Sequence, residues 1–152
     1  MTILYRILSL IINIVALLLT VSLLGSVMML LSSPQTMLSA FMMVAVILYT
    51  WFSFRFRREV LQQQKTVKHS LRDWVRVNGI VTLIFCIISI ITITPLLAHP
   101  QPFVDAIKNM GVTMPTETVK NFCYSMLVYA VILLIHILWT FALLKKHKEF
   151  FQ

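Results

Sequence analysis

Four long apolar runs dominate this sequence and decide what it can fold into. They cover about residues 7–31, 36–54, 75–97 and 121–144. A membrane-spanning α-helix needs about 20 mainly apolar residues, and each run is about that long. Because lipid offers no hydrogen bonds to the backbone, such a run must satisfy its own amides and carbonyls as a helix. The sequence therefore predicts an all-α membrane protein in which residues 1–152 form a single four-span domain.

The composition excludes an ordinary soluble domain. The chain is 59% hydrophobic and only 12% charged, whereas soluble domains carry about 25% charged residues. The formal net charge of +8 could suggest nucleic acid. However, the basic residues cluster at the ends of the apolar runs, where they act as topology signals and form no soluble basic face. We therefore expect the lipid bilayer, and no nucleic acid, as a partner.

The connections between the runs predict how the helices are arranged. Ser32, Ser33, Pro34 and Gln35 make a short polar turn after the first run. So short a connection brings the second run back beside the first, and repetition of this geometry predicts an antiparallel four-helix bundle. Both termini and the polar segment 55–74, which we call the hinge, then lie on one side of the membrane.

The basic residues predict which side that is. Ten of the thirteen lie at the termini or in the hinge, and Arg76 directly follows the hinge at the start of the third run. Only Lys108 and Lys120 fall in the outer loop, residues 98–120. Cytoplasmic segments carry an excess of Lys and Arg. Both termini and the hinge are therefore predicted to be cytoplasmic, and we expect a multi-pass protein of a bacterial inner membrane.

The hinge allows three interpretations. Its apolar residues Val60, Val67, Leu71 and Trp74 recur at roughly helical spacing between basic ones. The segment could extend the neighbouring helices into water, lie as a basic amphipathic helix on anionic lipid, or dock a partner protein. The candidate lipid- or partner-contacting residues are Arg55, Arg57, Arg58, Lys65, Lys68, Arg72 and Arg76.

Each run also carries a stripe of polar or small residues at helical spacing, which predicts that these faces turn towards each other. Counted inward from the outer ends, one member of each stripe lies about 20–25 Å deep. These four, Asn13, Thr50, Thr82 and His136, could form one polar layer. His136 is the ionisable residue of the layer, so a proton or ligand role stands beside a purely structural hydrogen-bonding role.

The chemistry for catalysis or metal binding is not evident. All five acidic residues lie outside the runs, and the other histidines share no ligand spacing with His136. Cys86 and Cys123 would differ in depth by roughly 15 Å, too far for a disulfide. We thus expect no cofactor, no metal and no enzymatic activity.

The expected role is an accessory or scaffold subunit that associates with itself or with another membrane protein. The alternative is a self-assembling channel or small transporter whose path is lined by the polar layer. A membrane enzyme is the third hypothesis, and the small number of acids and nucleophiles disfavours it.

Overall fold

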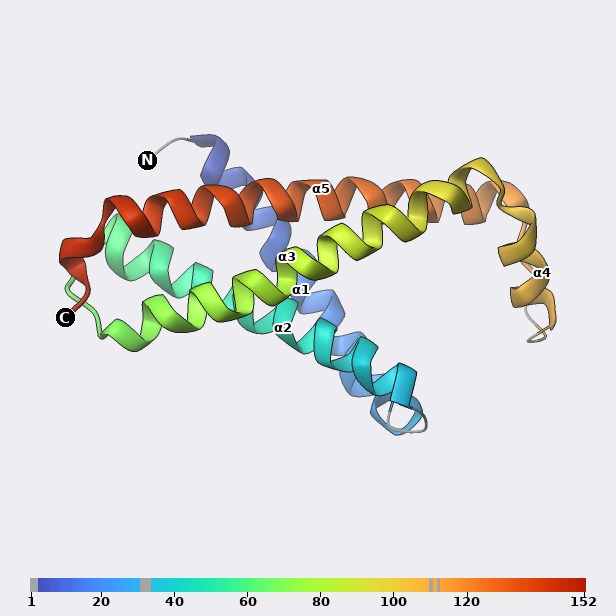
Figure 1. Cartoon of the computed structure of the whole chain (residues 1–152), viewed down its shortest axis with the longest axis horizontal. Helices are drawn as coiled ribbons and strands as arrows, with labels where there is room; N and C mark the ends of the chain where they lie inside the picture. The colour runs from blue at the N-terminus through green and yellow to red at the C-terminus, as the bar shows by residue number, and fades with distance from the viewer. Residues whose placement is uncertain (1–2, 31–33, 110, 112) are drawn as a thin grey trace. The chain divides into compact units, whose positions relative to one another are not determined.

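The computed structural model consists of α-helices joined by short connections (Figure 1). It describes the backbone of residues 3–30, 34–109, 111 and 113–152, with side chains except those of 26–30, 34 and 35. In this part of the chain there are five α-helices and no β-strand. They are α1 (Ile3–Leu30), α2 (Pro34–Phe56), α3 (His69–Ala98), α4 (Gln101–Asn109) and α5 (Thr116–Lys146).

Four of the described helices are long and apolar enough to cross a membrane: α1, α2 with its extension to Gln62, α3 and α5. This confirms the prediction of an all-helical chain with four long apolar helices. Large apolar side chains such as Leu17, Trp51, Ile91 and Leu138 are exposed on these helices. Exposed apolar surface on this scale is typical of contact with lipid or with another protein.

The helices are longer than the apolar runs. α3 begins at His69, within the polar segment, and continues through Pro95 to Ala98. The backbone amide of His99 still donates to the carbonyl of Pro95 at 2.9 Å. Proline is tolerated inside apolar helices where neighbouring groups satisfy the freed backbone. The expected turn after the first run includes Ser32 and Ser33, which lie outside the described residues.

The chain divides into two compact units. The first comprises Met1–Ile84 and Ile135–Gln152, so it contains α1, α2, the start of α3 and the end of α5. α1 and α2 are in contact here. Its core holds large buried side chains that include Tyr5, Tyr49 and Phe56.

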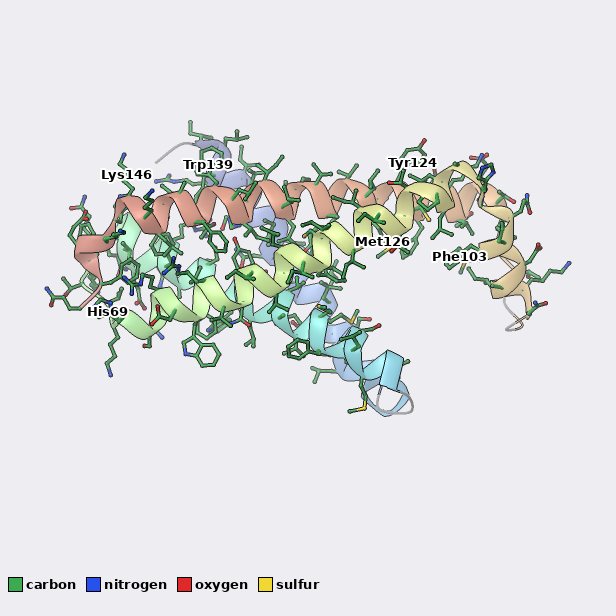
Figure 2. All side chains as sticks on the ribbon, viewed as in Figure 1. His69, Phe103, Tyr124, Met126, Trp139 and Lys146 are labelled. Carbon is green, nitrogen blue, oxygen red and sulfur yellow. The ribbon has the colours of Figure 1, made fainter. Side chains whose placement is uncertain are left out.

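The second unit, Phe85–Leu134, holds the end of α3, all of α4 and the start of α5. Its core is a small cluster of Ile93, Val119 and Cys123, against which α4 packs Phe103 and Ile107. Phe103 and the outward-pointing Tyr124 are labelled in Figure 2. α4 is therefore an amphipathic helix whose apolar side is covered by α3 and α5.

The hinge is not one continuous helix. A π-helical segment, η1 (Arg57–Gln62), extends α2, and Gln64 then adopts a left-handed conformation with φ 51°. Val67 forms an isolated parallel bridge with Phe151. The expected helix is interrupted because this part of the hinge pairs with residues far away in the sequence. Such pairing cannot be predicted from the periodicity of apolar residues.

Residues 148–152, here called the tail, make that pairing (Figure 1). The amide of Val67 donates to the Phe150 carbonyl at 2.8 Å, and the amide of Gln152 donates to the Val67 carbonyl at 3.0 Å. The buried ring of Phe151 also stacks on Phe56, with centroids 6.0 Å apart. The tail begins as a short 3₁₀ segment, η2 (Lys148–Phe150).

Candidate functional site

A cluster of four buried polar side chains joins α1, α2 and α5 in the first unit. We call Tyr5, Tyr49, His136 and Thr140 the tyrosine–histidine cluster; all four are at most 1% exposed. His136 and Thr140 lie one turn apart, so they share a face of α5. Tyr5 comes from the first turn of α1 and Tyr49 from the C-terminal half of α2. The cluster therefore draws three helices together.

The hydrogen bonds of the cluster assign its protons. Thr140 Oγ1 donates its only hydrogen to the carbonyl of His136 at 2.8 Å. Tyr5 and Tyr49 must then donate to Thr140 Oγ1, each at 3.1 Å. Tyr49 Oη, its own hydrogen engaged, accepts from His136 Nδ1 at 2.9 Å. The network thus assigns the neutral tautomer of His136 with the proton on Nδ1 and a free lone pair on Nε2.

The rings of the cluster pack as closely as its polar atoms. Tyr5 stacks on His136 with centroids 4.9 Å apart and an interplanar angle of 9°. Trp139 meets Tyr5 edge to face at 5.7 Å, where α5 passes the start of α1 (Figure 2). Both geometries are favourable for aromatic pairs. His136 is thus fixed by stacking as well as by hydrogen bonding.

Three polar atoms of the first unit are buried without a hydrogen-bond partner among the described residues: Ser53 Oγ, Arg57 Nε and His136 Nε2. Ser53 and Arg57 are one turn apart, and Arg57 lies within electrostatic range of Tyr5 and His136. A buried polar atom without a partner costs about 1–3 kcal/mol. Beside Tyr5 lies a cavity of about 420 Å³, which Trp139 and Lys146 also line.

The predicted polar layer is distributed over the first unit. Thr50, Thr82 and His136 are buried and Asn13 is half-buried. Asn13 Nδ2 donates to the carbonyl of Ser9 at 2.6 Å. Thr50 and Thr82 likewise donate to backbone carbonyls one turn earlier in their own helices. In the described part of the chain no hydrogen bond joins any two of the four, and the single layer stays a prediction.

Asn13 and Thr50 meet a different feature, a largely apolar groove of about 530 Å³ between α1 and α2. Thr20 also lines it and donates to the carbonyl of Ala16 at 2.7 Å. Leu17 and Trp51 supply apolar walls. Because the polar groups bond to their own helices, the groove presents few free donors or acceptors.

Gly79 lets α3 approach α5. A Cβ at this position would lie 2.7 and 2.8 Å from two ring atoms of Phe141, and 3.4 Å from the ring of Tyr49. Real Cβ atoms are not found so close to other atoms, so any side chain here would displace Phe141. Thr82, one turn later on the same face, is fully buried.

The seven candidate basic residues, six in the hinge and Arg76 just after it, divide into two sets. Towards α2, Arg55 pairs with Glu59 at 2.9 Å, and the Arg57 guanidinium lies 5.1 Å from the Phe54 ring. Arg58, Lys65 and Lys68 are exposed. Arg72 and Arg76 belong to α3, where they line a cavity together with residues from the end of α5.

The described residues contain no group of three His, Cys, Asp or Glu side chains that could hold a metal ion. Cys86 and Cys123 are both buried free thiols. The prediction that the protein uses no metal or cofactor stays a prediction.

Comparison with known proteins gives no relative from which a function could be transferred. No protein-family model, no curated protein sequence and no solved structure matches this chain.

Sequence reasoning missed the two tyrosines of the cluster. Tyr5 precedes the polar stripe of the first run by one turn, at Ser9, and Tyr49 is next to Thr50. Extending the stripe one turn towards the N-terminus would have found Tyr5. Tyr49 gave no comparable signal, because a tyrosine near the end of a span is usually an interfacial residue.

Proposed function

We propose that this chain is a multi-pass membrane protein that acts as a non-enzymatic accessory or scaffold subunit. In this proposal its four spans form an antiparallel bundle in a bacterial inner membrane. The observation that carries it is the tyrosine–histidine cluster, in which polar side chains of three spans bond to one another. Such bonds are the means by which helices associate in lipid.

The proposed orientation places both termini and the hinge in the cytoplasm. Eleven of the thirteen basic residues then lie on the cytoplasmic side, as the positive-inside rule requires. Pairing of the hinge with the tail supports this arrangement, because it holds residues 67 and 151 at the same end of the spans.

The hydrogen bonds favour a scaffold over a channel. A conducting path needs polar groups that remain free to face water along its length. Here Asn13, Thr50 and Thr82 each donate to a carbonyl of their own helix. The proposed bundle therefore has a closed interior and an apolar exterior, and its interactions with itself or another membrane protein take place through that exterior.

One observation favours the channel or transporter alternative. Ser53 Oγ, Arg57 Nε and His136 Nε2 are buried without partners, and all belong to the cytoplasmic half in the proposed orientation. Water admitted there could satisfy all three. A self-assembled oligomer would need to extend this wet region past Asn13, Thr50 and Thr82 to the other side.

Ion flux separates the two functions. We would reconstitute the purified protein into liposomes and measure proton and potassium flux, with protein-free liposomes as the baseline. The scaffold proposal predicts no flux above the baseline for the wild type. Flux that rises with protein content and falls in His136→Leu, but not in the exposed-site control Tyr124→Phe, would overturn it in favour of the channel.

The association part of the proposal has its own measurement. Particles cut from native membranes without detergent would be analysed for mass and composition. We expect a defined complex with another membrane protein or with further copies of this chain. A strictly monomeric protein in these particles would contradict a scaffold role.

A further inference from the structure

A basic cavity of about 620 Å³ lies between the start of α3 and the end of α5. Its lining combines two kinds of side chain, four cations and three large apolar groups. They come from two helices of the first unit and are Arg72, Arg76, Ile80, Phe141, Leu144, Lys145 and Lys148.

The spacing of these residues makes the cavity a regular feature of both helices. Arg72, Arg76 and Ile80 follow one another at intervals of four, so they form one stripe on α3. Phe141, Lys145 and Lys148 form the facing stripe on α5 and η2. In each stripe the cations lie towards the helix end and the apolar residue towards the middle of the span. The cavity thus has a polar end near the helix ends, here called its mouth, and an apolar end nearer the middle of the helices, here called its depth.

No acidic residue lines the cavity. One of the four cations has an acidic partner: the carboxylate of Asp73 lies 3.4 Å from Arg72 Nε and is well exposed. Four cations around one partly enclosed volume repel one another, and the repulsion grows as the local dielectric constant falls. An anion in the mouth of the cavity would relieve this repulsion and accept several charge-assisted hydrogen bonds.

The walls of the cavity are held in place by contacts already described. The Arg72 guanidinium lies 6.0 Å from the ring of Phe151, which in turn stacks on Phe56. Phe141 is held against Gly79, where no side chain could be added without moving its ring. Arg72 and Phe141 are therefore held in place before a ligand binds, which limits the entropy lost at these two side chains.

We propose that this cavity binds an anionic phospholipid, with the phosphate headgroup between the four cations and an acyl chain along Ile80, Phe141 and Leu144. Basic pockets between spans on the cytoplasmic side are suited to such headgroups. A free phosphate or a soluble acidic molecule would use only the mouth of the cavity and leave its apolar depth unfilled. The inference rests on the proposed placement of the spans and is independent of the scaffold role.

The test measures lipid binding to the purified full chain in a neutral detergent by native mass spectrometry. The probes are phosphatidylglycerol, phosphatidylcholine and inorganic phosphate. We expect phosphatidylglycerol to bind and phosphatidylcholine to bind at least tenfold more weakly. The double variant Arg76→Gln, Lys145→Gln should bind phosphatidylglycerol about thirtyfold more weakly, because each cation near a headgroup contributes about a factor of five.

A matched control distinguishes lipid binding in this cavity from a general attraction between anionic lipid and basic residues. Arg58→Gln, Lys65→Gln removes the same charge from the hinge, and neither residue lines the cavity. We expect less than about a threefold change for this variant. Equal losses in the two double variants would overturn the proposal. Displacement of the lipid by millimolar inorganic phosphate would also overturn it, in favour of a soluble anion.

A single substitution at an exposed residue tests the cavity with little risk that the variant fails to fold. Lys148 is exposed and makes no described side-chain contact, so Lys148→Gln leaves the packing unchanged and should weaken phosphatidylglycerol binding about fivefold. No weakening in this variant and in the double variant together would contradict the proposal. Because binding is measured in detergent, its failure is distinguishable from a failure of the membrane orientation, which is measured by labelling in cells.

Discussion

The hydroxyl of Tyr49 lies 2.9 Å from Nδ1 of His136 and joins α2 to α5 across 87 positions of sequence. Tyr49 also donates to Thr140, so one hydroxyl satisfies two groups on α5. No other residue type offers a hydroxyl at this reach on a rigid ring. A single oxygen atom therefore takes part in both of these hydrogen bonds between α2 and α5.

Tyr49→Phe removes that oxygen and leaves His136 Nδ1 buried without its partner. We expect the free energy of unfolding in detergent to fall by about 1–2 kcal/mol, since hydrogen bonds between spans contribute up to about that much. Tyr124→Phe is the matched control, because Tyr124 is a tyrosine of α5 that is 57% exposed. Equal effects of the two substitutions would mean that the Tyr49 hydroxyl has no structural role.

Gly79→Ala tests the close approach of α3 and α5. The new methyl group would meet the Phe141 ring, so we expect destabilisation by about 1–3 kcal/mol in the same unfolding measurement. Gly25→Ala is the control: no atom lies within 4 Å of the added Cβ, and alanine favours a helix by about 1 kcal/mol.

Replacing the Phe141 ring with a smaller side chain should restore part of the stability that Gly79→Ala loses. In the double variant Gly79→Ala, Phe141→Leu the two effects should be clearly less than additive, because they concern one contact. Strict additivity would indicate that Phe141 does not limit the approach.

The pairing of the tail with the hinge should slow amide hydrogen exchange in the hinge. The amides of Val67 and His69 donate to the carbonyls of Phe150 and Gln152, at 2.8 and 3.0 Å. Deleting residues 150–152 removes both acceptors, so exchange in a peptide covering residues 65–70 should accelerate by at least tenfold. Exchange in α4, which belongs to the other unit, should not change.

This measurement also decides between the interpretations of the hinge. If the tail holds the hinge, exchange at Val67 and His69 is slow in both anionic and zwitterionic lipid. Slow exchange in anionic lipid alone would show instead that the headgroups hold it.

The sequence alone predicts the helical architecture, because the length of an apolar run is a local property. It could not predict where helices end beyond those runs. α3 starts at His69, whose amide donates to the carbonyl of the distant Gln152. The sequence also could not predict where helical structure is interrupted in the hinge, since the interruption depends on the pairing of Val67 with Phe151. Periodicity reports which face a residue occupies and says nothing of such distant partners.

The same limit applies to the candidate site. Counting residues along the helices gives depth, so Asn13 and His136 were predicted at one level. Depth does not give the direction in which a side chain turns, and Asn13 bonds to Ser9 of its own helix while His136 bonds to Tyr49. The cluster depends on these directions, and they follow from packing.

The placement of the spans is tested most directly by labelling single cysteines in intact cells. Cysteine would be introduced at Gln63 in the hinge or at Gln101 at the start of α4, both exposed. The native Cys86 and Cys123 are buried, so the unmodified chain serves as the background control. With a membrane-impermeant thiol reagent outside, Gln101→Cys should react and Gln63→Cys should react only after the membrane is opened. Labelling of Gln63→Cys in intact cells, or equal labelling of both positions, would contradict a cytoplasmic hinge and a membrane-spanning α3.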